Sequence, residues 1–506
     1  MKQIIILFLA FCSLQAAAQS NSLLMLDINN SAARINSNGM FFQDVANQMG
    51  YYRPHKLSQG NTIYQMSVSA TAKDQNGQDR LSVTTYDDSD LTCGPVATNY
   101  SDPDYISKYG NKLWRVDYSE ITQHKQNWNN AGYTVPDVIA KWPGNGDVSN
   151  GMAAKLAPYT DINGNGIYDP ENGDYPDIMG DRAIYLIMND KNNTKFPGTI
   201  PLNMEVHFMF YQYVSNAPLS WTTFLNVKVF NRSSETLTDM KWNILTDFDL
   251  GDYADDFGGT DLSRNMTYVY NGTNVDGNGQ MGSFGANPPA MGMISLNHPL
   301  MTSIFPDSIP EPGQEFLNVI NGKQADGTAI TNNGSPTLFQ FTDTLGTGYN
   351  EPALNNAPGE RRSFSTVSLG TFAPNSVKCM DFVWVYGRKL TGTSLLKSVH
   401  DMMQVADFVQ IYYNNTNHCV DGTLQIASIE SAKMEIYPNP SEGKITCVSD
   451  QELELIEVWN MEGKLIRTVQ THEKEMTLDL STLTAGVYLI KLSTGNETKT
   501  LPFYKQ

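Results

Sequence analysis

The sequence predicts a mainly β protein: a large antiparallel β-sandwich body with long loops and one C-terminal helix, followed by a small immunoglobulin-like β-sandwich. Short runs rich in Val, Ile, Tyr, Phe and Trp alternate with turns rich in Asn, Asp, Gly and Pro along most of the chain. Only 394–414 repeats apolar residues at helical spacing. Because strands and helices do not alternate, we expect antiparallel sheets stacked as a sandwich.

Seven segments carry clear strand patterns. In 205–211 both faces are apolar or aromatic, which predicts a strand covered on both sides. Around Val227 and Trp242 apolar residues alternate with polar ones, which predicts strands with one face in water. The predicted strands are 62–70, 183–188, 204–214, 222–230, 241–248, 267–270 and 379–386.

Residues 1–18 have the layout of a secretory signal peptide. Lys2 precedes an apolar run at 4–11, and three alanines at 16–18 form a small-residue cleavage site before Gln19. The run is shorter than the roughly 20 residues that a membrane-spanning helix needs. No later segment approaches that length, so we expect no transmembrane segment after the signal peptide is removed.

The exported chain is strongly acidic. The full sequence has 34 basic and 53 acidic residues, and loss of Lys2 leaves 33 basic residues and takes the formal net charge from −19 to −20. Such a chain repels nucleic acid and anionic lipid, so we expect neither as a partner. Carboxylates are also the ligands that calcium prefers, although an acidic surface that only keeps the protein soluble explains the charge equally well.

Four cysteines remain after the one in the signal peptide. Cys379 and Cys419 flank a predicted strand and the predicted helix, and they can pair in an oxidising compartment. Cys93 and Cys447 have no evident partner, so the pairing stays open.

The segment 161–174 has the ligand spacing of a calcium-binding loop. Oxygen side chains occupy loop positions 1, 3, 5 and 9, and Gly166 at position 6 permits the sharp turn. Position 12 is Asn172, so Glu171 or Asp174 must supply the closing carboxylate. A turn without metal is the alternative. The predicted calcium ligands are Asp161, Asn163, Asn165, Ile167 through its carbonyl, Asp169 and Asp174.

A second acidic cluster lies at 247–261. Its carboxylates repel one another unless a cation or solvent screens them. It matches no fixed ligand template, so a solvated acidic loop is the alternative. The candidate metal ligands here are Asp247, Asp249, Asp255 and Asp256.

Catalytic motifs are missing from the sequence. There is no His-Glu-x-x-His and no Gly-x-Ser-x-Gly. His207 shares a strand face with Glu205, and a structural histidine beside a buried carboxylate is the favoured interpretation. Tryptophans such as Trp114, Trp142 and Trp221 can stack on sugars or fill the core. We therefore predict no catalytic residues.

The C-terminal residues 434–506 open with Tyr437-Pro438-Asn439-Pro440. Strand patterns follow at 453–459 and 486–492, with a turn at 462–464 and a Leu483-x-x-Gly486-x-Tyr488 step. This region resembles the C-terminal sorting domain of proteins that Bacteroidota export through the type IX secretion system. The resemblance implies that 434–506 engages the type IX machinery and that the protein is secreted, extracellular or on the outer-membrane cell surface. A linker at 427–433 separates it from the β-rich body, 19–426.

The body also resembles a group of exported Bacteroidota proteins that end in the same sorting domain. The matching segments include 26–30, 139–147, 156–166, 173–190 and 247–256. The resemblance implies no established activity.

These observations predict a calcium-stabilised β-sandwich at the cell surface or outside the cell. It would serve adhesion, matrix structure or binding of an unknown extracellular ligand, with glycan as a candidate class. An extracellular hydrolase acting on polysaccharide or protein is the alternative, and a self-assembling surface-layer component is a third.

Overall fold

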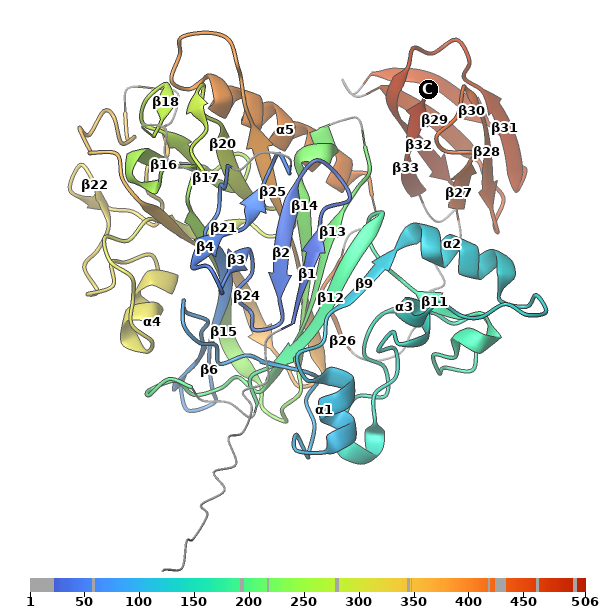
Figure 1. Cartoon of the computed structure of the whole chain (residues 1–506), viewed down its shortest axis with the longest axis horizontal. Helices are drawn as coiled ribbons and strands as arrows, with labels where there is room; N and C mark the ends of the chain where they lie inside the picture. Colours follow the sequence, from blue (N-terminus) through green and yellow to red (C-terminus); the bar gives the residue numbers. More distant parts are fainter. Residues whose placement is uncertain are drawn as a thin grey trace, which may run out of the picture.

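In the computed structural model the body is a sandwich of two antiparallel sheets that face each other across a hydrophobic core (Figure 1). This confirms the predicted fold class. The structure describes residues 22–56, 60–191, 195–215, 218–277, 282–343, 346, 348–416, 419–423, 434–460, 464–494 and 498–506. The predicted signal peptide, the linker 427–433 and most of the 462–464 turn lie outside these residues.

The larger sheet has ten strands among the described residues. β26 (Gly422–Thr423) pairs with β25, and β9 (Trp114–Asp117) pairs with β12. The other strands, in spatial order, are β16 (Asp256–Asp261), β17 (Met266–Asn271), β20 (Ala290–Ser295), β25 (Ser376–Gly387), β14 (Thr223–Asn231), β13 (Met204–Gln212), β12 (Arg182–Asn189) and β8 (Thr92–Cys93).

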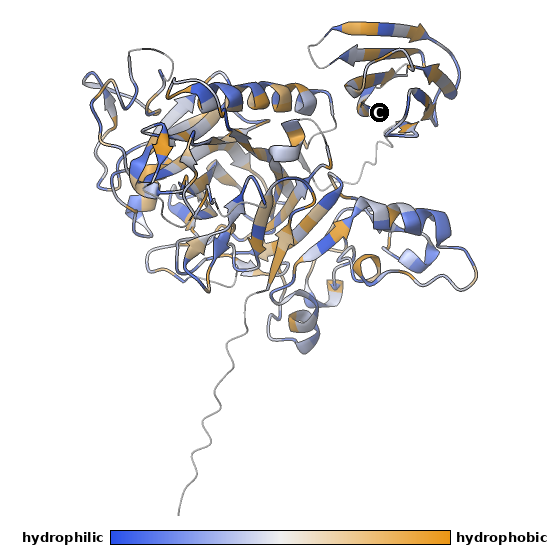
Figure 2. Ribbon diagram, turned by 45° about the horizontal axis from the view of Figure 1, so that its top comes forward, coloured by the Kyte–Doolittle hydropathy of each residue, from blue (hydrophilic) through white to orange (hydrophobic). Residues whose placement is uncertain are grey.

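The smaller sheet faces the larger one. Its order is β21 (Leu300–Ile304), β24 (Arg361–Phe372), β15 (Leu237–Phe248), β6 (Gln65–Lys73) and β7 (Asp79–Ser82). Side chains such as Phe208, Phe210, Trp242 and Trp384 fill the space between the sheets, and each is at most 1 % exposed. In Figure 2 the apolar residues accordingly gather on the central strands.

Strand β13 is buried along its whole length, as its two apolar faces predict. The prediction of half-solvated strands around Val227 and Trp242 is wrong, because most of the polar residues between the apolar ones are buried as well and Lys228 is partly buried. Asn226 donates to Asp381 at 2.8 Å, and Asn243 donates to Thr366 Oγ1 at 2.9 Å. These cross-strand hydrogen bonds satisfy the side-chain N–H donors of Asn226 and Asn243, which the pattern placed in water.

The long helix α5 (Lys397–Asn414) covers the outer face of the larger sheet, close to the predicted 394–414. The segment between β8 and β12 adds three short helices: α1 (Pro103–Tyr109), α2 (Tyr118–Asn127) and α3 (Asp137–Ala140). Together with α5 it encloses a second apolar cluster. Helix α4 (Gln314–Ile320) covers the outer face of the smaller sheet.

Smaller elements complete the body. An N-terminal sheet joins β1, β2 and β5, and four two-stranded ribbons lie in the loops that the structure describes. Their bounds are β1 (Leu23–Leu26), β2 (Ala32–Asn36), β5 (Tyr52–Arg53), β3 (Gln43–Asp44), β4 (Met49–Gly50), β10 (Tyr159–Thr160), β11 (Tyr175–Pro176), β18 (Val275–Asp276), β19 (Gly285–Ala286), β22 (Thr331–Asn332) and β23 (Ser335–Pro336). The described part of the body also contains the 3-10 turns η1 (Val148–Asn150), η2 (Pro170–Asn172), η3 (Pro218–Trp221) and η4 (Tyr253–Asp255).

The C-terminal domain is a separate small sandwich with its own core, drawn in red in Figure 1. Pro502 lies in the edge strand β33, where a missing backbone donor is tolerated. One sheet is β27 (Met434–Tyr437), β28 (Lys444–Ser449) and β31 (Glu475–Asp479); the other is β30 (Leu465–Gln470), β29 (Leu455–Asn460), β32 (Gly486–Ser493) and β33 (Thr498–Lys505).

A disulfide joins Cys379 on β25 to Cys419 beyond α5, one of the pairings that the sequence left open. Cys93 and Cys447 are free thiols, and Cys447 is buried in the core of the C-terminal domain.

Candidate metal centre

The predicted calcium loop 161–174 connects β10 to β11, which pair and hold the two ends of the loop together. The two carboxylate oxygens of Asp161 accept hydrogen bonds from the backbone N–H groups of Gly164 and Gly166, both at 2.7 Å. Gly166 has φ +79°, a conformation that glycine adopts without steric cost. The turn therefore folds around the first predicted ligand.

Asp169 is the centre of the hydrogen bonds inside this loop. Its carboxylate accepts from the side-chain amides of Asn163, Asn165 and Asn172, at 3.2, 2.9 and 2.8 Å. These hydrogen bonds, that of Asn172 foremost, lower the pKa of Asp169, so it is ionised at neutral pH. The structure thus brings Asn163 and Asn165 to the same carboxylate.

Asp174 closes the loop from its other end. Its carboxylate accepts from the N–H of Ile162 at 2.8 Å and of Asp169 at 2.9 Å, and its side chain is fully buried. Burial raises its pKa. Glu171, the alternative closing residue, is exposed. The side chain of Ile167 is also exposed, and its N–H donates to Asn165 Oδ1 at 2.8 Å.

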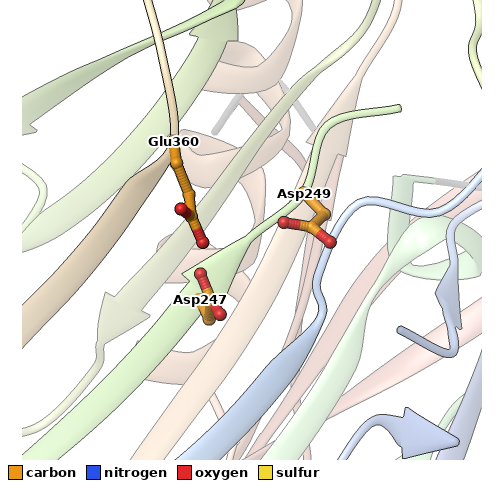
Figure 3. A group of neighbouring side chains, drawn as sticks. All are labelled: Asp247, Asp249 and Glu360. Carbon is orange, nitrogen blue, oxygen red and sulfur yellow. The ribbon is translucent and has the colours of Figure 1, made fainter. Parts of the chain in front are cut away.

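The second predicted cluster is divided between two places. Asp247 lies at the end of β15, Asp249 two residues later, and Glu360 just before β24. One carboxylate oxygen from each lies within 4.8 Å of the other two, and Figure 3 shows the three side chains converging. Sequence reasoning missed Glu360, because strand pairing alone brings it to Asp247: Arg362 of β24 is the register partner of Asp247.

Two polar groups border this trio. Tyr86 donates its hydroxyl hydrogen to Asp247 at 2.8 Å, and Arg362 forms ion pairs with Asp247, at 3.6 Å, and with Glu360. Burial raises the pKa of Asp247 to about 6. Burial and then the charge of Asp247 raise the pKa of Asp249 to about 8. Three carboxylates and one arginine leave an excess of negative charge, which a proton or a bound cation can compensate near neutral pH.

Asp255 and Asp256 belong to a neighbouring group around Asp276. Asp276 accepts from the N–H groups of Asp252, at 2.8 Å, and Phe284, and Asp255 accepts from Gly277 N–H at 3.1 Å. Asp256 is fully buried, and its pKa is raised by burial and then by the charges of Asp255, Asp276 and Asp249. One of its carboxylate oxygens has no hydrogen-bond partner among the described residues.

The histidine pair of the sequence forms a buried network. His207 Nε2 lies 3.1 Å from Glu205 Oε1, and the hydroxyl of Tyr185 lies 2.7 Å from His207 Nδ1. Arg232 contacts the same Glu205 carboxylate. Burial lowers the pKa of His207, so the imidazole is neutral and Arg232 supplies the countercharge.

The small C-terminal sandwich, with its own core and two sheets, is the part of the chain that a family model identifies. Residues 435–504 match the family model described as the secretion system C-terminal sorting domain. This is the sorting domain of the type IX secretion system, which confirms the resemblance found in the sequence. The protein is thus exported to the cell surface or the extracellular space. None of the helices in the described residues is both long enough and apolar enough to span a bilayer.

No curated protein matches the chain. Among solved structures, it resembles a polysaccharide lyase at 10 % identity and a TM-score of 0.21, over 64 % of this chain and 39 % of the lyase. It also resembles HBP35 of Porphyromonas gingivalis at 14 % identity and a TM-score of 0.14, over 50 % of this chain and 62 % of that one. The chain thus spans less than two thirds of either protein, and neither likeness assigns an activity to it.

Proposed function

We propose that this protein is a calcium-stabilised β-sandwich that acts outside the cell in binding or adhesion, with the 161–174 loop as its calcium staple. The convergence of Asn163 and Asn165 on Asp169 carries the proposal. Asparagine amides have an oxygen and a nitrogen in nearly equivalent positions. In this structure the two amide oxygens accept from the N–H groups of Asn165 and Ile167, so a calcium ion would have to replace these turn hydrogen bonds to recruit the oxygens beside the Asp169 carboxylate, a set of ligands that suits a hard cation.

The loop also supplies the anchoring that a structural site needs. The Asp161 carboxylate is fixed by two backbone donors, and the buried Asp174 by two more. Ligands held this way lose little further freedom when a cation binds. No helix directly flanks the loop, so we expect calcium to stabilise the body rather than to switch it between two shapes.

The test is the melting temperature of the exported chain, Gln19 to Gln506, in millimolar calcium and in chelator. Calcium at a hundredfold above its dissociation constant adds about 2.7 kcal/mol. A body of roughly 400 residues has an unfolding entropy of about 0.8 kcal/mol per kelvin, so calcium should raise its melting temperature by about 3 °C. Asp161→Ala should abolish this rise, whereas Asp326→Ala, in an exposed turn, should keep it.

Asp161→Ala also removes two hydrogen bonds, and that loss appears equally with chelator present. The calcium-dependent difference is therefore the quantity to compare. An unchanged melting temperature in calcium would refute the proposal that calcium stabilises the body. A rise that survives Asp161→Ala but disappears in Asp249→Asn would move the calcium site to the trio of Asp247, Asp249 and Glu360.

An extracellular hydrolase is the second candidate, favoured by that same trio. Carboxyl groups whose pKa values are raised to about 6 and 8 can donate protons near neutral pH, as a general acid must. Hydrolysis of a polysaccharide or protein that is lost in Asp249→Asn, without a calcium-dependent melting shift in the unchanged protein, would support this candidate instead.

A further inference from the structure

A pocket of about 750 Å³ lies in the segment between β8 and β12. Its wall is formed by the end of α1, by β9, by α3 and by residues 141–145. Tyr168 and Pro170 of the 161–174 loop complete it. A volume of this size suits one or two sugar rings.

The lining of this pocket is basic, although the chain is acidic. It contains four cationic side chains, Lys108, Lys112, Arg115 and Lys141, and one carboxylate, Asp137, which gives a formal local charge of +3 in a chain of −19. Lys141 pairs with Asp137 at 2.5 Å. Lys108 is exposed and interacts electrostatically with Asp147, whereas the exposed Lys112 and Arg115 form no ion pair among the described residues. Their charges are therefore available to an anionic ligand.

Aromatic rings form the apolar part of the lining. Trp114 is partly exposed, and Tyr109 lies beside it, with ring centroids 6.5 Å apart. The polar tips of the other rings are held by the protein: Trp142 Nε1 donates to Pro158 O at 2.9 Å, and the Tyr168 hydroxyl donates to Ile139 O at 2.7 Å. These two rings and Tyr109 are buried, so they support the wall, and Trp114 is the aromatic lining residue that can offer a face to a sugar.

From this combination we propose that the pocket binds an anionic sugar, a carboxylate- or sulfate-bearing unit of an extracellular glycan. The cations would pair with the acidic group and an aromatic ring would stack on the apolar face of the sugar. The inference deepens the proposed binding function and rests on it. Long polyanions such as nucleic acid fit poorly, because the rest of the chain repels them.

The pocket is also joined to the predicted calcium loop. The side chain of Asn145 accepts from Tyr168 N–H and donates to Tyr168 O, both at 2.8 Å. This clamp fixes the residue that precedes Asp169. The aromatic wall therefore depends on the order of the loop, while the cations belong to α1, to the turn between α1 and β9, to β9 and to the end of α3.

The experiment is calorimetric titration of the exported chain with three oligosaccharides of similar length. Oligogalacturonate carries carboxylates, a chondroitin sulfate oligosaccharide carries both carboxylates and sulfates, and cello-oligosaccharide is neutral. We expect at least tenfold tighter binding of an anionic sugar than of the neutral one, and weakening with salt. The Lys112→Ala/Arg115→Ala variant should lose at least tenfold in affinity. Both side chains are exposed, so this variant should fold.

The matched control is Lys323→Ala/Lys389→Ala, which removes the same charge from exposed positions outside the pocket. It should leave the affinity unchanged. Equal losses in the two double variants would show general attraction of anions and overturn the proposal, as would equal binding of the neutral sugar or no binding of any. The calcium proposal is tested by melting temperature and the sugar proposal by calorimetric titration. Either proposal can therefore fail without the other.

Discussion

Replacing Arg232 by methionine tests the buried charge network of β13. Glu205 is fully buried, and it accepts hydrogen bonds from Arg232, from His207 and from the N–H of Val96 at 2.7 Å. Burial acts to raise its pKa, but the hydrogen bonds and charges of its neighbours prevail and hold it at about 2, below the ordinary 4.5. The depression corresponds to about 3 kcal/mol of stability at neutral pH.

Methionine keeps the apolar stem and removes the countercharge. An unpaired buried carboxylate costs about 4 kcal/mol. With an unfolding entropy of about 0.8 kcal/mol per kelvin, the melting temperature at pH 7 should fall by about 5 °C. In the unchanged protein, the depressed pKa of Glu205 stabilises the folded state only while Glu205 is ionised. This stabilisation is fully present above pH 4.5 and is lost as the pH falls toward 2.

The assay is thermal unfolding of both proteins at pH 7.5, 5.5 and 4. In the variant Glu205 can take up a proton, so the difference between the two proteins should narrow steadily as the pH falls. Adding Glu205→Gln to the variant should recover most of the loss. Arg264→Met, at a pair with Asp407 that is partly exposed, should cost about 1 °C or less. A shift below 1 °C for Arg232→Met, or a difference that does not change with pH, would refute the reasoning.

Two further predictions follow from the disulfide and the sorting domain. Cys379→Ser/Cys419→Ser opens a loop of 40 residues, which should cost about 4 kcal/mol and lower the melting temperature by about 5 °C, and no change in non-reducing conditions would contradict it. Deleting 434–506 should leave the protein in the periplasm of a host with a type IX secretion system, as fractionation and immunoblotting would show; normal export of the truncated chain would contradict the sorting role.

The sequence predicts what is local in this protein and misses what strand pairing assembles. The 161–174 loop could be predicted from the sequence because its side chains lie within fourteen consecutive residues. The place of Glu360 beside Asp247 could not be predicted from the sequence, because 113 residues separate the two and only the β15–β24 register brings them together. Likewise, the sequence predicts that Asn226 and Asn243 face solvent, because their hydrogen-bond partners, Asp381 and Thr366, are distant in sequence.

The short helices α1 and α2 did leave local signals. Asp102 and Pro103 form an N-cap followed by proline at the first helical position, and Asp117 with Glu120 forms a capping box. These signals stand among many Asn, Asp and Gly turns and precede helices too short for a clear apolar period. The sequence therefore indicates turns more strongly than helices in this segment.

The Cys379–Cys419 bond determines how the body bears mechanical load. The chain leaves the body after β26, whose pairing with β25 is next to this bond and to the Lys378–Asp421 ion pair. Tension applied from the C-terminal end therefore enters β25, an inner strand of the larger sheet, and α5 lies inside the closed covalent loop. A pull in that direction cannot unwind α5 while the bond is intact, so the body should resist force along this axis until the sheet itself yields.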